Sequence, residues 1–398
     1  MYVGRLADPS WRICGVGVLE SDRRVCDALR AQDGRYTLVL KHPDGTLEHE
    51  VIDAIVAVLH APTDRAGVVD RMADPATRIV SLTITEGGYA SDEHGVFAMV
   101  VEALRRRRAA GVAPFTVLSC DNIEGNGEVA RRAVCAVAGD LASWVTEQVC
   151  FPSSMVDRIT PATTAQARAL VRRNWAIEDD APVMAEPFTQ WVLEDHFSAG
   201  RPLFESVGVH LVEDVRPYEL MKLRLLNAGH QSLAYPGLLL GHASVHDAAR
   251  DPVLQGLLRA YWREAVSTLA EVPGIDLDAY QESLLERFGN PHVADTLARL
   301  SSFASDRIPA FLMPVVRDSC AAGGSVAASA LVVAAWIRCR ELMELVEQRV
   351  LPRGPELLDH LGAVPDGFRE QVLGGLAALR LDPRAALAGW VTNTPQRA

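Results

Sequence analysis

Short apolar runs alternate with helical patterns over the first 160 residues, and this alternation most constrains the fold. Apolar, β-branched runs occupy 12–18, 36–41, 78–85 and 115–119. Helical patterns occupy 21–31, 62–73, 95–110 and 127–149. Apolar strands that are each followed by a helix predict a parallel sheet covered on both faces. The segment KHPDGTLE at 41–48 indicates a turn centred on Asp44 and Gly45.

Long helical patterns replace this alternation from about residue 213. They occupy 217–240, 252–270, 277–288, 292–304, 325–350 and 366–380, and strand signals are few. The chain has 398 residues, a length typical of two domains. We therefore predict an α/β domain over residues 1–212 and a mostly α-helical domain over residues 213–398.

The bulk composition excludes several classes of protein. The net charge of −12, from 39 basic and 51 acidic residues, argues against a nucleic-acid-binding surface. No apolar run reaches the roughly 18 residues of a membrane span, and the first residues lack the layout of a secretory signal. We expect neither a nucleic-acid nor a membrane partner. Oligomeric state is not decided by the sequence, and we expect a monomer or a weak homo-oligomer.

Cysteine usage points to a reducing compartment. The seven cysteines include no CxxC pair and no Cys/His cluster with zinc-ligand spacing. We therefore expect free thiols, a cytoplasmic location and no metal. Cys120 is interpreted as a packing residue rather than a nucleophile, because no base is evident beside it. The run RRRR at 105–108 is interpreted as a solvated helix face, with phosphate contact as the alternative.

Polar and small residues follow two of the predicted strands. The segments are SLTITEGGY at 81–89 and TVLSCDNIEGNGEVARR at 116–132. Ligands of parallel sheets bind beyond the carboxyl ends of the strands, where these segments lie. Their glycines permit tight turns and close approach of a ligand. We predict a binding site at these strand ends.

The segment ELMKLRLLNAGH at 219–230 carries Glu219, Lys222, Asn227 and His230 on a leucine-rich helical pattern. At about 100° per residue, these four side chains fall within an arc of about 140° if the helix is unbroken. Lysine can hold a proton or an oxyanion, asparagine can donate a hydrogen bond, and histidine can orient a hydroxyl. The segment therefore indicates either a site for proton transfer or the solvated face of an ordinary amphipathic helix.

The dinucleotide-binding motif GxGxxG is not complete in this chain. Gly15 and Gly17 form only GxG, and Glu20 stands at the position of the third glycine. The run 12–18 is, however, followed by Asp22. An acid after the second strand of such a unit binds the ribose hydroxyls of NAD, and capping of the next helix is the alternative role.

Five segments resemble the mannitol dehydrogenase family, the polyol-specific long-chain dehydrogenases of mannitol 2-dehydrogenase and fructuronate reductase type. They are TEGGY (85–89), SCDN with NG (119–122, 126–127), FPSSMVDRITP (151–161), EPFTQWVLED (186–195) and Lys222-x4-Asn227-x2-His230. The resemblance spans most of 11–315. It implies a Rossmann-like N-terminal domain, a helical C-terminal domain and an NAD(P)-dependent oxidoreductase without metal. Such an enzyme interconverts a polyol or hexonate and its keto sugar.

The resemblance also implies roles for the residues of the 219–230 segment. Lys222 matches the general base of oxidation and the acid of reduction. Asn227 and Asn122 match the amides that hold the developing oxyanion, and His230 matches a binder of a substrate hydroxyl. Glu219, one turn before Lys222, is a candidate proton relay, with a plain ion pair as the alternative.

Further contacts follow from the same resemblance. Those to substrate are assigned to Asp157, Arg299 and Arg307. Those to the cofactor are assigned to Asp22, Thr85, Glu86 and Gly87, and Asp22 favours NAD over NADP. The resemblance does not distinguish mannitol, arabinitol and fructuronate as substrates.

One departure from the family gives a second hypothesis. The family begins with a strand and a glycine-rich loop of the pattern GxGxFxRxH, and no such pattern stands before 12–18. We therefore expect the first domain to lack this strand and loop. The chain is then either an oxidoreductase of the mannitol/fructuronate type or a relative that has lost cofactor binding and catalysis.

Overall fold

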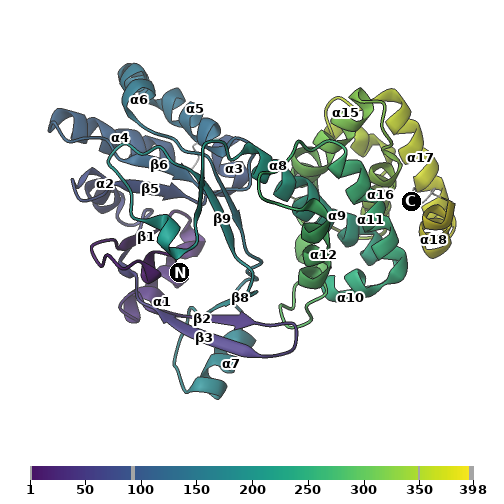
Figure 1. Cartoon of the computed structure of the whole chain (residues 1–398), viewed down its shortest axis with the longest axis horizontal. Helices are drawn as coiled ribbons and strands as arrows, with labels where there is room; N and C mark the ends of the chain where they lie inside the picture. Colours follow the sequence, from purple (N-terminus) through teal and green to yellow (C-terminus); the bar gives the residue numbers. More distant parts are fainter. Residues whose placement is uncertain (1, 91–94, 348–349, 394–398) are drawn as a thin grey trace. The chain divides into compact units, whose positions relative to one another are not determined.

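A computed structural model describes residues 2–90, 95–347 and 350–393 of the chain. The chain folds into two compact units, Met1–Glu219 and Leu220–Ala398. In Figure 1 the first unit runs from purple to teal and contains every labelled strand, whereas the second runs from green to yellow. The predicted fold class, a Rossmann-like α/β domain followed by a mostly helical one, is confirmed.

The strands of the first unit form four small sheets rather than the single parallel sheet that we predicted. They are β1 (Ile13–Gly17), β2 (Tyr36–Lys41), β3 (Leu47–Ile52), β4 (Ile55–His60), β5 (Ile79–Leu82), β6 (Thr116–Ser119), β7 (Ser154–Asp157), β8 (Val183–Ala185), β9 (Gln190–Glu194) and β10 (His210–Val212). β1 pairs with β4 and β5 pairs with β6, both in parallel. Among the described strands, neither member of the β1–β4 pair is hydrogen-bonded to a member of the β5–β6 pair.

The strands β2 and β3 form an antiparallel hairpin, and β2 also pairs in parallel with β8. The predicted turn closes this hairpin: the N–H of His42 donates to the carbonyl of Thr46, and Gly45 has a φ of 90°. The remaining sheet has the order β10-β9-β7, with β7 antiparallel to β9. A hairpin needs only a short turn, and this is why β2 is followed by a strand instead of a helix.

Helices cover the parallel pairs of the first unit. They are α1 (Arg23–Ala31), α2 (Arg65–Ala73), α3 (Thr85–Ala90), α4 (Val96–Ala109), α5 (Asn126–Ala138), α6 (Ala142–Gln148) and α7 (Ala165–Trp175), with α8 (Arg216–Met221) carrying the boundary between the units. Short 3-10 turns are η1 (Val3–Arg5), η2 (Glu20–Asp22), η3 (Gly139–Leu141) and η4 (Phe204–Val207). The predicted helix 127–149 is interrupted at Gly139, whose φ of 56° does not continue an α-helix.

The strand β6 is buried on both faces. On one face Val117 packs into a core built from α2, α4, α5 and α6, and Figure 1 shows α4, α5 and α6 on one side of β5 and β6. On the other face Leu118 packs against Leu193, Phe204 and Val209. Burial on both faces holds the carboxyl end of β6 and the loop that follows it in place.

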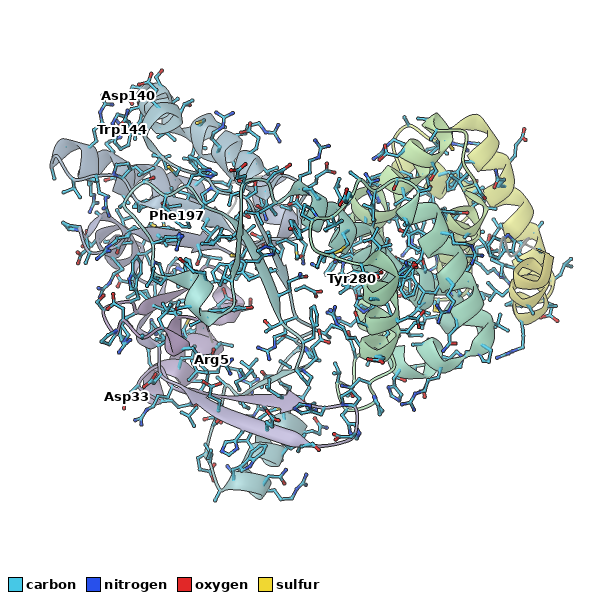
Figure 2. The ribbon with its side chains drawn as sticks, viewed as in Figure 1. Arg5, Asp33, Asp140, Trp144, Phe197 and Tyr280 are labelled. Atoms are coloured by element: carbon cyan, nitrogen blue, oxygen red, sulfur yellow. The ribbon has the colours of Figure 1, made fainter. Side chains whose placement is uncertain are left out.

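The arginine run 105–108 is only partly the solvated face that we predicted. Arg105 pairs with Asp140, and Arg106 pairs with Glu102 and Asp70. In Figure 2, Asp140 is labelled beside Trp144, whose ring lies under the Arg108 guanidinium at 5.6 Å. The prediction was wrong for Arg107, which is 1% exposed. Its guanidinium donates to the carbonyls of Met72, Asp74, Thr77 and Ala113.

The described elements of the second unit are helical. They are α9 (Ala228–Leu239), α10 (Val245–Arg250), α11 (Pro252–Val266), α12 (Leu277–Phe288), α13 (Leu297–Ser301), α14 (Ala304–Arg307), α15 (Met313–Ala321), α16 (Ala327–Leu342), α17 (Asp366–Leu381) and α18 (Pro383–Asn393). Two segments, η5 (Lys222–Asn227) and η6 (Ile308–Leu312), are π-helical, and η7 (Pro355–His360) is a 3-10 turn. None of the helices that the structure describes is long and apolar enough to cross a membrane.

The helix α9 is the centre of the second unit. It is buried at almost every position and packs against α11, α13 and α16, and Figure 1 shows α9, α11 and α16 side by side. A helix that is buried all round has no solvated face, and this excludes the amphipathic alternative for its part of the 219–230 segment. The predicted helix 277–288 coincides with α12. Within 292–304 the helix α13 covers only Leu297–Ser301, and Phe303 has a φ of 56°.

Candidate active site

The loop after β6 is tied to the loop after β5 by Asp121. Its carboxylate accepts hydrogen bonds from the backbone N–H groups of Ile84 and Thr85 at 3.1 and 2.9 Å. It also accepts one from the hydroxyl of Tyr89 at 2.8 Å. These bonds hold Thr85 at a φ of 62°, a conformation that L residues rarely adopt. The two predicted strand-end segments therefore form one structure, and our sequence reasoning had assigned no role to Asp121.

Asn126 joins the same loop to β7. Its buried side-chain amide donates to the carbonyls of Asp121 and Ser154 at 3.0 and 2.7 Å, and its oxygen accepts the N–H of Ser154 at 3.0 Å. Asn122 is exposed in this loop, and Asp157 is the last residue of β7 and is 4% exposed. The structure thus places two predicted site residues on segments that Asn126 holds together.

Gly127 has a different role from the one predicted. A Cβ at this position would lie 2.4 Å from the carbonyl oxygen of Phe151 and 2.8 Å from the N–H nitrogen of Ser153. The glycine therefore allows α5 to pack directly on the backbone of 151–153, rather than allowing a ligand to approach. Gly125, with a φ of 63°, supplies the turn before α5.

Glu219 is buried against this loop at the end of the first unit. Its Oε2 accepts the N–H of Gly125 at 2.8 Å, and its Oε1 has no hydrogen-bond partner among the described residues. Burial, with the nearby charge of Glu124, raises the pKa of Glu219 to about 7 against the opposing effect of the Gly125 hydrogen bond. A carboxyl group with this pKa exchanges protons near neutral pH.

Asp22 lies directly after β1, at its carboxyl end. Its Oδ2 accepts the backbone N–H groups of Val18 and Leu19 at 2.9 and 2.8 Å. A Cβ on Gly17 would lie 2.6 Å from the Cys26 sulfur and 2.8 Å from the Asp22 Cβ, so the glycine is needed for this tight turn. The carboxylate is half-exposed and lies beyond the carboxyl end of β1, the edge at which ligands of parallel sheets bind.

The other predicted cofactor contacts lie on α3. Thr85 and Gly87 are exposed at its start, beyond the carboxyl end of β5. Glu86 belongs to the same helix, but its side chain lies outside the described part of the chain. An acid after β1 and an exposed turn after β5 are both compatible with a dinucleotide, which binds parallel sheets at these ends.

Lys222 and Asn227 begin and end the π-helical segment η5 in the second unit. The N–H of Ala228 bonds to the carbonyl of Leu223, five residues back, in place of the α-helical four. One turn of a π-helix takes about 4.4 residues, so Lys222 and Asn227 lie about 50° apart around the axis, on one face. In an unbroken α-helix the same two residues would lie about 140° apart.

Lys222 is buried, and Asn227 is partly buried. Lys222 is 4% exposed. The side-chain oxygen of Asn227 is buried and has no hydrogen-bond partner among the described residues. A buried polar atom without a partner costs free energy, so this amide oxygen remains available to accept a hydrogen bond.

His230, on α9, belongs to a second group of polar residues in this unit. Its ring packs on Phe288 at a centroid distance of 4.3 Å. The ring interacts electrostatically with the buried carboxylate of Asp295, which binds the Arg299 guanidinium through both oxygens. Burial opposes ionisation of Asp295, but Arg299 and then His230 outweigh it and lower its pKa. Our sequence reasoning missed Asp295, which orients Arg299.

Arg307 is placed beside Arg299. Its guanidinium donates to the backbone carbonyls of Arg299 and Leu300 at 3.4 and 3.2 Å. Both arginines therefore have partners within the protein, although a guanidinium has five N–H groups and retains donors for a ligand.

Two further sequence predictions concern Cys120 and a metal site. Burial raises the pKa of the Cys120 thiol to about 12, and this disfavours a nucleophilic thiolate. Over the described ranges, the structure contains no group of three His, Cys, Asp or Glu residues that could hold a metal ion.

Comparison with known proteins matches both units to one family. The mannitol dehydrogenase Rossmann domain matches residues 2–206, and the mannitol dehydrogenase C-terminal domain matches residues 214–350. The mannitol 2-dehydrogenase of Cereibacter sphaeroides is 42% identical over 354 residues, covering 82% of this chain and 74% of the relative. Mannitol dehydrogenase DSF1 of Saccharomyces cerevisiae is 40% identical over 357 residues, covering 82% and 71%.

Two solved structures resemble the whole chain. The Pseudomonas fluorescens mannitol 2-dehydrogenase, in a ternary complex with NAD and D-mannitol, has a TM-score of 0.87 and 36% identity, covering 96% of this chain and 88% of that one. A D-sorbitol dehydrogenase in substrate-free form has a TM-score of 0.80 and 34% identity, covering 96% and 89%. On this evidence, the chain belongs to the mannitol dehydrogenase family.

Proposed function

We propose that this protein is an NAD-dependent oxidoreductase that interconverts a polyol and its keto sugar. The observation that carries the proposal is the buried alignment of Lys222 with Asn227 on η5. It gives a proton-transferring amine and an oxyanion-binding amide on one face. The names of the relatives support the substrate class, because they are mannitol and sorbitol dehydrogenases.

Each residue of the proposed site has a distinct task. NAD, when bound, accepts the hydride from the carbinol carbon in the direction of oxidation. Lys222 takes the hydroxyl proton, because a side-chain amine in its neutral form is a base. Asn227 and Asn122 donate hydrogen bonds to the developing alkoxide without competing for the proton. In reduction, Lys222 returns the proton.

The remaining groups bind and orient. His230 holds a substrate hydroxyl, and Asp157, Arg299 and Arg307 contact the other oxygens of the substrate. Asp22 accepts hydrogen bonds from the ribose hydroxyls, and the segment of Thr85, Glu86 and Gly87 contacts the cofactor. Arginines also suit a carboxylate, so this set serves a hexonate as well as a polyol.

Glu219 is proposed as the relay that passes the proton between Lys222 and solvent. Its pKa of about 7 suits this exchange at neutral pH. We expect Glu219→Gln to remove the ionisation near pH 7 from the profile of kcat against pH, because the amide cannot titrate. An unchanged pH–rate profile in this variant would exclude the relay.

The raised pKa of Glu219 also predicts how stability depends on pH. Between pH 4.5 and about 7, the folded protein binds more protons at Glu219 than the unfolded chain. The stabilisation that comes from this raised pKa is therefore fully present below pH 4.5. It falls by about 3 kcal/mol as the pH rises to about 7. Glu219→Gln should be more stable than wild type at pH 8 and not at pH 4.5, in urea unfolding. An equal difference at both pH values would contradict the raised pKa.

Calorimetric titration tests the cofactor assignment. Wild type should bind NADH in a saturable manner and NADPH more weakly, because the Asp22 carboxylate repels a 2′-phosphate. Asp22→Asn keeps an oxygen for the N–H groups of Val18 and Leu19, so the turn persists. It should shift the preference toward NADPH by about tenfold through loss of the charge. Asp27→Asn, an exposed acid on α1, is the matched control and should leave the preference unchanged.

Activity on a panel of substrates completes the test. The panel contains mannitol, sorbitol and arabinitol with NAD, and fructose and fructuronate with NADH. Turnover of at least one pair supports the proposal. A folded chain that binds neither cofactor, and turns over no member of the panel, would instead be a relative that has lost cofactor binding and catalysis.

A further inference from the structure

The π-helical register of η5 changes which backbone groups are hydrogen-bonded within the helix. In an α-helix, the N–H of Ala228 would bond to the carbonyl of Arg224, but here it bonds to that of Leu223. The carbonyls of Arg224 and Leu225 lie in a buried segment, where a polar atom needs a partner. A π-helical turn persists only when its surroundings supply such partners.

Two consecutive residues of α11 supply them. The hydroxyl of Tyr261 donates to the carbonyl of Arg224 at 2.8 Å. The indole Nε1 of Trp262 donates to the carbonyl of Leu225 at 2.9 Å. Both side chains are 0% exposed, so water does not compete for these carbonyls.

The approach of Trp262 is made possible by a glycine on α9. A Cβ on Gly229 would lie 3.1 Å from the indole Nε1, closer than ordinary contact. Because Gly229 has no side chain, the indole nitrogen of Trp262 can pass close to α9 and reach the π-helical segment. This close packing is a second observation, besides the hydrogen bond, that the indole is specifically placed against this backbone.

The helix α11 is itself firmly anchored. The buried carboxylate of Glu264 accepts the N–H groups of Ala328 and Ser329 at 2.8 and 2.9 Å, at the start of α16. The Arg224 guanidinium donates to the carbonyl and hydroxyl of Thr268, just after α11, at 2.9 and 2.6 Å. The donors of α11 and the π-helical segment thus belong to one connected framework.

We propose that Tyr261 and Trp262 are positioning residues, which hold η5 in its π-helical register and so keep Lys222 and Asn227 on one face. The consequence for catalysis rests on the proposed function. If the segment relaxed to an α-helix, Lys222 and Asn227 would diverge by about 140°. The base and the oxyanion donor would then no longer serve the same oxygen.

Tyr261→Phe and Trp262→Phe test the proposal, because each removes a donor and keeps a ring. Each should lower kcat by about tenfold or more and change the KM values for NAD and polyol by less than about twofold. Gly229→Ala is a second route, since its methyl group displaces the indole without deleting a donor. Ser329→Ala is the matched control: it removes the 2.7 Å hydrogen bond of a buried hydroxyl to Glu264 but keeps the two backbone N–H donors that anchor α11.

A direct readout does not depend on turnover. The chain contains only two lysines, Lys41 and Lys222, so selective 15N labelling gives two side-chain signals. Replacing Lys41 with arginine assigns them. We expect the midpoint of the Lys222 titration, and the exchange rate of the Ala228 amide, to change in Tyr261→Phe, Trp262→Phe and Gly229→Ala. Both should stay at wild-type values in Ser329→Ala.

The possible outcomes separate the two proposals. If the three variants titrate and turn over like Ser329→Ala, Tyr261 and Trp262 are ordinary core residues and the positioning role is wrong. If wild type turns over no polyol, the proposed function fails, yet the Lys222 titration and Ala228 exchange still decide whether α11 holds the π-helical register. A variant that loses only thermal stability, with both signals unchanged, also overturns the proposal.

Discussion

We expect Lys222→Ala to lower kcat for polyol oxidation by at least about a thousandfold, because the variant would lack the proposed proton acceptor. Binding of NADH should stay within about twofold of wild type, since the role proposed for Lys222 is proton transfer and not cofactor binding. The fall should appear equally in kcat and kcat/KM, the pattern of a group that acts in the transition state. Steady-state kinetics in both directions and NADH titration measure these quantities.

The other lysine supplies the control for this experiment. Lys41 is half-buried on β2 in the first unit, and its replacement with alanine should leave kcat within about twofold. Substantial turnover by Lys222→Ala, with an unchanged pH–rate profile, would show that another group is the base. Loss of NADH binding in the same variant would show that the substitution had disturbed more than proton transfer.

Arg107→Met destabilises the first unit by about 4 kcal/mol, because it leaves several buried carbonyls without a donor. The guanidinium reaches Thr77 and Ala113 at 2.7 Å and also serves the end of α2 through Met72 and Asp74. Methionine fills much of the volume but donates no hydrogen bond. Urea unfolding followed by circular dichroism, with limited proteolysis to identify the unit that unfolds, measures the loss.

The neighbouring arginines are matched controls within the same run. Arg105 and Arg106 form ion pairs on the surface, where such pairs contribute about 0–1 kcal/mol. Arg105→Met and Arg106→Met should therefore change the free energy of unfolding by less than about 1 kcal/mol. An equal loss in all three variants would mean that the buried contacts of Arg107 contribute no more than a solvated pair.

Much of the fold could be predicted from local patterns. The runs at 12–18, 36–41, 78–85 and 115–119 became β1, β2, β5 and β6, and 277–288 became α12. Burial on one face of a helix, or on both faces of a strand, leaves a periodicity that a single segment carries. Which strands pair is a different question, because pairing joins residues far apart in the chain. The four separate sheets, and the hairpin of β2 with β3, were therefore not predicted.

In the candidate site, too, some residues could be predicted from local sequence and others could not. The residues with proposed chemistry stood in recognisable segments. Spacing placed Lys222, Asn227 and His230 within one arc, and the resemblance to the family supplied their expected roles. The residues that connect those segments were missed. Asp121, Asn126 and Asp295 are common polar residues in the sequence, and only their partners in space give them a role.

By itself, the sequence determined the two-domain class, the membership in a family and the types of side chain available for proton transfer, since these depend on composition, periodicity and short motifs. The tertiary structure alone decided the register of η5 and the burial of Arg107. In both cases the backbone carbonyls need donors, and those donors come from another part of the chain: Tyr261 and Trp262 for η5, and Arg107 for the loop after α2. Such long-range hydrogen bonds leave no local pattern from which they could be read.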